Sequence, residues 1–144
     1  MELEPIEFNI DRSQEMYSQA NCQLVIDAMV ETYKSKGFNK PWVGYLACKD
    51  NRVKGTGGFV RKPEDGKVET AYWTFAEFEG RGVASFICDQ LIKISKSIDP
   101  TVMITAKTAP ELNASTRVLQ KNGFLFIEII ADEEIGNAWL WALH

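Results

Sequence analysis

FEGRGVAS (residues 78–85) joins the strand-like run VETAYWTF (68–75) to an amphipathic helical pattern over 84–97. This strand–turn–helix unit is the most informative feature of the sequence. A glycine-containing turn that feeds a helix leaves backbone N–H groups unpaired at the positive end of the helix dipole. That geometry suits a phosphate or pyrophosphate group. A purely structural tight turn is the alternative interpretation.

The segments after the turn predict a crossover and a closing hairpin. Residues 101–106 form a strand-like run after the helix, and a strand–helix–strand connection predicts that strands 68–75 and 101–106 are parallel. Asn113 is the predicted N-cap of a short helix that ends before Gly123. An antiparallel pair of strands, 124–131 and 137–143, then completes the chain.

The segments before the turn predict an antiparallel meander. Strand-like runs at 42–48, 52–61 and 67–75 are separated by short turns. Upstream, residues 6–10 are a candidate strand. Residues 11–36 are helical, as one helix or as two that break near Asn21, with Gly37 as the stop.

The helical segment carries an apolar face that we interpret as core packing. The face is formed by Leu24, Val25, Ala28, Met29 and Tyr33. Together the elements predict an α+β fold, with a mixed and mostly antiparallel sheet flanked by helices, in a single domain spanning 1–144.

Composition and charge narrow the class of protein. The chain has 144 residues, 45% of them hydrophobic, which is sufficient for the hydrophobic core of one domain. Its formal net charge of −4 disfavours nucleic-acid binding, which depends on an excess of basic residues. Its three cysteines lie far apart and His144 is its only histidine, which disfavours a metal site. No signal peptide and no membrane span of the required ~18 apolar residues is present, which predicts a cytoplasmic protein without membrane contact.

Two motifs resemble those of the GNAT superfamily, the acetyl-CoA-dependent N-acetyltransferases. EGRGVA at 79–84 is similar to the superfamily's motif A, Q/R-x-x-G-x-G/A, with Glu79 in place of the usual Gln or Arg. NASTRVLQKNGF at 113–124 is similar to a block found in the RimJ/RimL branch. The resemblance covers about residues 42–143.

The resemblance implies a GNAT-like sheet whose central parallel pair splays apart, with acetyl-CoA as the co-substrate. The pyrophosphate would lie on the N–H groups of residues 80–85, and the pantetheine arm would enter the gap between strands 68–75 and 101–106. A backbone N–H near Phe75 would polarise the thioester carbonyl. The implied coenzyme-binding residues are Trp73, Thr74, Phe75, Gly80, Arg81, Gly82, Val83, Ala84, Ser85, Asn113, Ser115 and Arg117.

Glu69 is the candidate general base, because a protonated amine must lose a proton before it can attack a thioester. It lies on strand 68–75, where many members of the family carry a glutamate. A strand carboxylate paired with a lysine is the alternative, and Glu77 and Glu79 are fallback bases. The tyrosine that protonates the leaving thiolate in many members would fall at Leu119, so no acid is visible there. Cys88 has apolar helical neighbours and is predicted to be a packed thiol.

The predicted function is acetyl transfer from acetyl-CoA to a primary amine of a small molecule or a protein. The alternatives are a non-catalytic acyl-CoA-binding or sensing module and a structural domain whose turn binds nothing. A homodimer formed through the late strands is a further expectation. Five aromatic residues line an acceptor pocket or pack against the sheet, with packing favoured for most of them: Trp42, Tyr45, Tyr72, Trp139 and Trp141.

Overall fold

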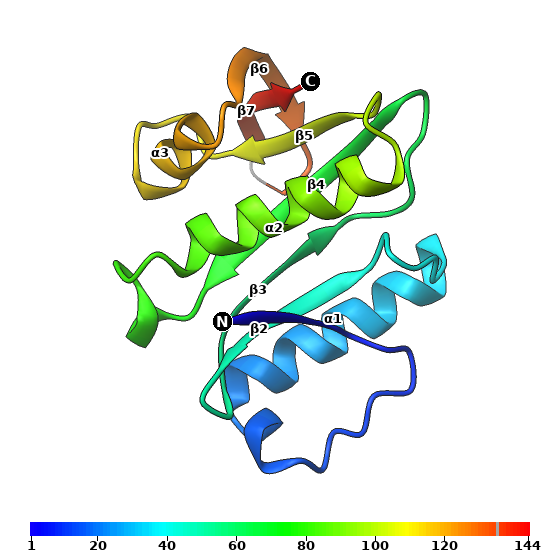
Figure 1. The fold of residues 1–144 in the computed structure, drawn as a ribbon. Coiled ribbons are helices and arrows are strands. Elements are labelled where there is room, and N and C mark those ends of the chain that lie inside the picture. The colour runs from blue at the N-terminus through cyan, green and yellow to red at the C-terminus, as the bar shows by residue number, and fades with distance from the viewer. Residues whose placement is uncertain (135) are drawn as a thin grey trace.

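The computed structural model describes residues 1–134 and 136–144, and a mixed β-sheet forms its centre (Figure 1). In this described part of the chain, seven strands lie in the order β1-β2-β3-β4-β5-β7-β6. The elements in chain order are β1 (Glu2–Pro5), η1 (Glu15–Tyr17), α1 (Ala20–Lys36), β2 (Gly44–Lys49), β3 (Arg52–Phe59), β4 (Lys67–Thr74), η2 (Ala76–Phe78), α2 (Val83–Ile98), β5 (Met103–Thr108), α3 (Ala114–Lys121), β6 (Leu125–Asp132) and β7 (Gly136–Leu143).

The parallel pair β4–β5 is the structural centre, and α2 is its crossover connection. The strands pair only from Lys67↔Met103 to Thr70↔Ala106. Over the described residues no further β4–β5 pairing follows, although β4 continues to Thr74 and β5 to Thr108. The other neighbouring strands are antiparallel. The predicted α+β fold with a splayed parallel pair is confirmed.

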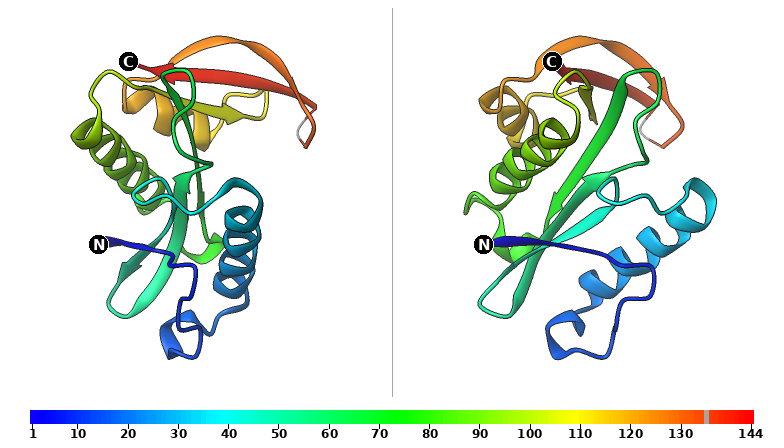
Figure 2. Two further views of the ribbon diagram at one scale, coloured as in Figure 1. Left: turned by 90° about the vertical axis from the view of Figure 1, so that its right-hand side faces the viewer. Right: turned by 45° about the vertical axis from the view of Figure 1, so that its right-hand side comes forward.

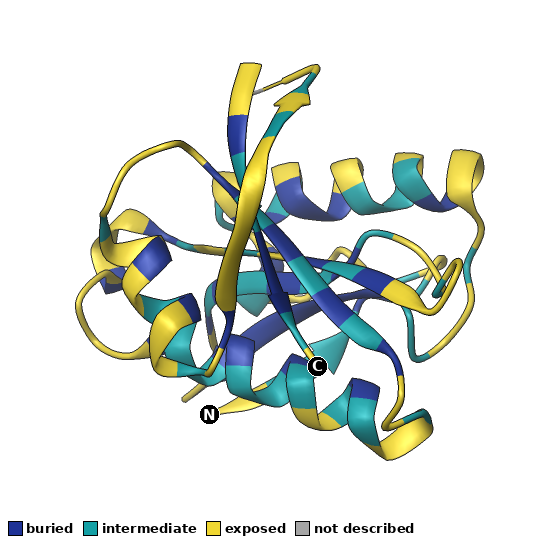
Figure 3. Ribbon diagram, turned by 90° about the horizontal axis from the view of Figure 1, so that it is seen from above, coloured by how far each residue is buried: buried dark blue, intermediate teal, exposed yellow. Residues whose placement is uncertain are grey.

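Helices cover both faces of the sheet, with α1 and α2 on opposite sides (Figure 2). Gly44 of β2 lies against the Met29 side chain of α1, where an added Cβ would be 2.7 Å from the methionine Cε. Gly57 of β3 lies against Ile87 of α2 in the same way. Buried residues are concentrated in the central strands and on the helix faces turned toward them (Figure 3).

The N-terminal third departs from the sequence prediction in two places. The strand predicted at 6–10 is wrong, because Glu2–Pro5 forms β1 instead and pairs with β2. Ile6 follows β1 as a fully buried residue. The helical segment divides into η1 and α1, close to the predicted break near Asn21, and α1 ends at Gly37 with φ 91° as predicted.

The predicted apolar face of α1 packs into the core only in part. Val25 and Tyr33 are buried, but Leu24 is 62% exposed and Ala28 is also exposed. The interpretation of this whole face as core is therefore wrong, and part of it borders a hollow described below.

The three cysteines are free and buried. Burial, with a smaller contribution from Asp89, raises the pKa of Cys88 to about 12. At neutral pH this thiol is protonated, which confirms the packed thiol and excludes Cys88 as an activated nucleophile. Within residues 1–134 and 136–144, no group of histidine, cysteine and carboxylate side chains could hold a metal ion. No helix in that same part of the chain is long and apolar enough to cross a membrane.

Candidate active site

The turn between β4 and α2 is built on two glycines in the left-handed region. Gly80 has φ 76° and Gly82 has φ 78°, a backbone conformation that glycine adopts without strain. Gly82 is the N-cap of α2 and supplies no side-chain cap. A Cβ built on either glycine would meet nothing within 4 Å, so the turn faces open space.

The backbone donors of this turn are unpaired. The first hydrogen bond of the helix runs from the Phe86 N–H to the Gly82 carbonyl at 3.0 Å. No group in the described part of the chain accepts a hydrogen bond from the N–H groups of residues 80–85. Unpaired donors at the positive end of a 16-residue helix form a site suited to an anion.

These donors open onto a groove of about 570 Å³ between α2 and α3, which we name the α2–α3 groove. It is lined by residues 72–74, 79–80 and 82–85 on one side and by 114–115, 117–118 and 121 of α3 on the other. Nine of the predicted coenzyme-binding residues line it: Trp73, Thr74, Gly80, Gly82, Val83, Ala84, Ser85, Ser115 and Arg117.

The charges along the α2–α3 groove are mixed. Arg117 and Lys121 lie four residues apart on α3, so both reach the same side of the helix. Sequence reasoning missed Lys121, although the lysine of the second motif and its spacing from Arg117 were visible. Glu79 also lines the groove and adds a carboxylate.

Three predicted coenzyme-binding residues lie outside the lining of the α2–α3 groove. Phe75 is 1% exposed, and its N–H donates to the Lys54 carbonyl at 3.0 Å. Arg81 is exposed beyond the groove. Asn113 caps α3, where its Oδ1 accepts the Thr116 N–H at 3.1 Å.

The free backbone groups of β4 at the splay belong to Tyr72 and Thr74. The Phe75 N–H donates to the Lys54 carbonyl of β3, and the Glu69 carbonyl accepts the Val60 N–H directly after β3. Successive residues of a strand point their backbone groups to opposite sides. Tyr72 and Thr74 therefore turn their N–H groups toward the opening beside β5. The Thr74 Oγ1 is buried without a hydrogen-bond partner among the described residues, next to the groove.

A smaller cavity of about 240 Å³, which we name the splay cavity, lies where β4 and β5 separate. Tyr72, Ser115 and the fully buried Leu119 are among its lining residues. The Tyr72 hydroxyl donates to the Ser115 carbonyl at 2.9 Å. Burial, with a smaller contribution from Cys88, raises the pKa of Tyr72, so the phenol stays protonated at neutral pH.

Glu69 lies outside the linings of both hollows and takes part in an ion cluster. Its Oε1 is 3.4 Å from the Lys107 Nζ, which is also 3.4 Å from an Asp132 carboxylate oxygen. Burial alone would lower the pKa of Lys107, but Glu69 and Asp132 together raise it. The lysine-paired carboxylate that the sequence left open is therefore present.

The other face of β4 holds a third hollow of about 300 Å³, which we name the α1 hollow. It is lined by one face of α1, by residues 56–60 of β3 and its end, and by 71–73 of β4. Residue 72 borders all three hollows. Tyr72 therefore borders hollows on both faces of β4.

All five aromatic candidates pack against or hydrogen-bond to neighbouring groups. Trp42 makes an edge contact with Phe59 at 5.0 Å, and the Tyr45 hydroxyl donates to a backbone carbonyl. The Trp141 Nε1 donates to Thr108, and Trp139 lies 6.3 Å from the Trp141 ring. Tyr72 packs against the core, donates its hydroxyl to the Ser115 carbonyl, and also borders all three hollows.

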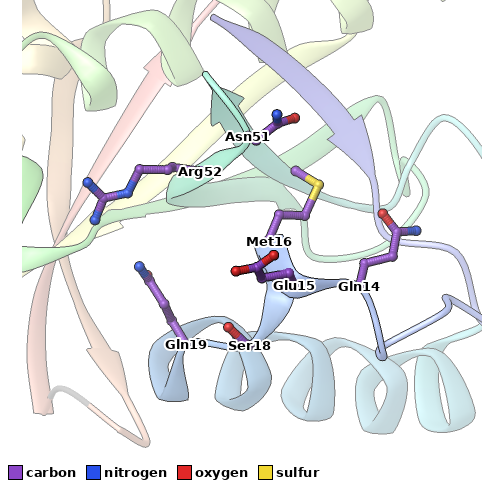
Figure 4. A pocket seen from close by; sticks show the side chains of 7 residues that line it. All are labelled: Gln14, Glu15, Met16, Ser18, Gln19, Asn51 and Arg52. Carbon is purple, nitrogen blue, oxygen red and sulfur yellow. The ribbon is translucent and has the colours of Figure 1, made fainter.

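A fourth, polar pocket of about 540 Å³ lies away from the splay, between the η1 region and the β2–β3 turn (Figure 4). Glu15 and Arg52 supply its charges. The Arg52 guanidinium also lies 3.4 Å from the carboxylate of Glu77, which is outside the pocket lining. The pocket shares no lining residue with the α2–α3 groove, so it is a less suitable reaction site.

A family model, the acetyltransferase (GNAT) domain, matches residues 3–125 of the chain. No curated protein sequence matches it.

Among solved structures, three similarities are representative. RimL, a ribosomal L7/L12 alpha-N-protein acetyltransferase in complex with coenzyme A, has a TM-score of 0.66 and 17% identity over 88% of this chain and 72% of that one. YncA, a putative acetyltransferase from Salmonella typhimurium with acetyl-CoA, has a TM-score of 0.66 and 16% identity, over 83% of this chain and 73% of that one. A spermidine N-acetyltransferase SpeG chimera from Vibrio cholerae and hSSAT has a TM-score of 0.73 and 13% identity, over 99% of this chain and 95% of that one. At these identities the likeness concerns the fold alone.

Proposed function

The chain belongs to the GNAT acetyltransferase family, and on that premise we propose that it moves an acetyl group from acetyl-CoA to a primary amine of a small molecule or a protein. The observation that carries the proposal is the set of unpaired N–H groups at residues 80–85, which open onto a groove leading to the splay. The family is one of N-acetyltransferase enzymes, and its model spans most of the chain.

Acetyl-CoA fits the residues present. The N–H groups of residues 80–85 would hold its pyrophosphate, and Arg117 and Lys121 would add charge-assisted contacts from α3. The orphaned Thr74 Oγ1 would gain a partner beside the groove. When bound, acetyl-CoA supplies a thioester, which is an activated acyl group.

The N–H groups of Tyr72 and Thr74 are the donors that would polarise the thioester carbonyl. Both point into the splay, whereas the Phe75 N–H is already bonded to Lys54. A preformed donor aimed at a developing negative charge lowers the barrier of acyl transfer. The expected role near Phe75 therefore moves to its neighbours on the strand.

Glu69 is the proposed general base, acting directly or through water from the α1 side of β4. It accepts a proton from the ammonium group, and the neutral nitrogen then forms the new N–C bond as the C–S bond breaks with its electron pair on sulfur. The second proton of the nitrogen leaves to solvent. Lys107 holds the Glu69 carboxylate in place at 3.4 Å.

No side chain is proposed as an acid for the leaving thiolate. Leu119 occupies the place of the family's tyrosine, and the Tyr72 hydroxyl donates to Ser115. A thiol pKa of about 8.5 makes the thiolate a tolerable leaving group, and water can supply its proton.

A non-catalytic acyl-CoA-binding module is the second candidate, favoured by Leu119 and by the ion pair that holds Glu69. The two candidates differ in turnover. Calorimetry with CoA and a free-thiol assay with acetyl-CoA and a panel of primary amines separate them. The proposed enzyme binds CoA and releases thiol with at least one amine. Binding without turnover supports the module, and no CoA binding at millimolar ligand contradicts both.

We also propose that residues 1–144 act as one acetyltransferase domain and that two copies associate through the late strands. The described strands form a single sheet, which supports the first proposal. β6 is an edge strand with exposed apolar side chains, which supports the second.

A further inference from the structure

The α1 hollow and the α2–α3 groove lie on opposite faces of β4 and share Tyr72 and Trp73. Figure 2 shows the corresponding helices, α1 and α2, on opposite sides of the sheet. A molecule in the α1 hollow and an acyl donor in the α2–α3 groove would therefore meet across one strand. Glu69 lies on the same face of β4 as Ala71, two residues before this wall of the hollow.

The lining of the α1 hollow is mainly apolar. From α1 come Val25, Ala28, Met29, Thr32 and Lys36, which recur at helical spacing on one face. Trp73 contributes from β4 and is 45% exposed, so part of its side chain is uncovered beside the hollow.

The polar groups of the α1 hollow are few and already engaged. The Thr32 hydroxyl donates to the Ala28 carbonyl at 2.9 Å, and the Thr56 hydroxyl donates to the Tyr45 carbonyl at 2.8 Å. Among the described residues that line this hollow, Lys36 carries the only charge, and that charge is positive. The described lining residues therefore offer no carboxylate to pair with a second ammonium group.

We propose that the α1 hollow binds the acceptor and selects a compact monoamine with an apolar body, a proposal that rests on the acetyl transfer proposed above. A polyamine would place additional ammonium groups in an apolar lining without counter-ions and near Lys36, which is unfavourable. An apolar body instead buries its surface against Met29 and Trp73.

The size of the α1 hollow also favours a compact acceptor. Its volume of about 300 Å³ lies at the small end of the range for ligand sites, roughly 300–1,000 Å³. A compact amine fills such a space, and its nitrogen then lies toward β4 and Glu69. The proposed acceptor is thus defined by both charge and size.

The first experiment compares two probe amines, phenethylamine and spermidine, with acetyl-CoA in steady-state kinetics. The expected result is a kcat/KM at least tenfold higher for phenethylamine. A kcat/KM for spermidine equal to or above that of phenethylamine overturns the inference and leaves acetyl transfer intact. No turnover with any amine overturns the proposed function itself, and the inference with it.

The second experiment changes the α1 hollow with matched controls on the same helix. Ala28→Leu fills the hollow and should raise the KM for phenethylamine at least tenfold, whereas Ser35→Leu lies outside the lining and should not. Thr32→Asp adds the missing carboxylate and should raise kcat/KM for spermidine at least fivefold, whereas Ser35→Asp adds the same charge without effect. An unchanged CoA Kd shows that each variant is folded. Equal effects of the hollow variants and their controls overturn the inference.

Discussion

Glu79 is the residue that fits least well with the α2–α3 groove in which it lies. The groove opens onto unpaired N–H groups and contains Arg117 and Lys121, all of which attract an anion. A carboxylate repels an anion at the same place, and Glu79 occupies the motif position that usually carries Gln or Arg. We therefore expect Glu79 to weaken anion binding in the groove without preventing it.

Glu79→Gln should tighten CoA binding by about two- to fivefold at low salt, the effect expected of one exposed charge. The gain should shrink as ionic strength rises, because salt screens exposed charges. Calorimetry at two salt concentrations measures both effects. Glu77→Gln is the matched control, since Glu77 lies outside the groove lining and contacts Arg52. Equal or weaker binding by Glu79→Gln contradicts the placement of the diphosphate.

Glu69→Gln should lower kcat at neutral pH by roughly 100-fold, the typical contribution of a general base. Only amine molecules that have already lost a proton would then react, so the rise of kcat with pH should move toward the amine's own pKa. The CoA Kd should stay unchanged, because Glu69 lies outside the groove lining. A pH–rate profile like that of the parent protein, or of the control Glu64→Gln, removes Glu69 from the role.

At the scale of elements, the β4–α2 turn is a strained position that glycine relieves. Gly82 and Gly66 have nearly the same φ, 78° and 73°, and a Cβ at either would meet nothing within 4 Å. They differ in place, since Gly82 precedes α2 and Gly66 closes the β3–β4 turn. Backbone strain and ligand binding can therefore be separated with one pair of variants.

Gly82→Ala and Gly66→Ala should each lower the free energy of unfolding by about 1–2 kcal/mol, because both force a left-handed backbone on alanine. Only Gly82→Ala should weaken CoA binding, by at least fivefold, as the donors of the turn shift. Chemical denaturation and calorimetry give the two numbers. Comparable losses of CoA affinity in both variants would show that the effect is global.

The sequence predicted the elements whose signals are local. Gly37 and Gly123 mark helix ends. The β4–turn–α2 unit is predictable because its glycines and the apolar stripe of its helix lie close together in the sequence. β1 is missed because its alternating pattern is only four residues long, contains two glutamates and a proline, and pairs with the distant segment Tyr45–Cys48 of β2.

The candidate site was predictable to the same extent. The groove residues near Gly82 follow from the motif, but the roles proposed for Tyr72 and Thr74 depend on which side of β4 pairs with β3. The sequence predicts core packing for the apolar face of α1, because such a face has the same pattern whether it is covered or borders a cavity.

At the scale of the whole molecule, the two edges of the sheet differ. β1 carries Glu2, Glu4 and Pro5, residues that discourage pairing with another chain. β6 exposes Leu125, Phe126, Ile127 and Ile129, and its sequence contains neither lysine nor proline. A second copy pairing with β6 about a two-fold axis would cover these side chains and remove the open edge.

Size-exclusion chromatography with light scattering should therefore give twice the chain mass of 16.3 kDa at micromolar concentration. Ile129→Lys, at a position 63% exposed, should give the monomer with little change in thermal stability. A monomeric parent protein, or a dimer unaffected by Ile129→Lys, contradicts association through β6.

The N–H groups of residues 80–85 can be observed one by one in an amide correlation spectrum of the ¹⁵N-labelled protein. The account predicts that CoA shifts these resonances downfield as they gain hydrogen bonds, and that pantetheine, which lacks the diphosphate, leaves them in place. Saturable CoA binding without perturbation of residues 80–85, or equal perturbation by pantetheine, would contradict it.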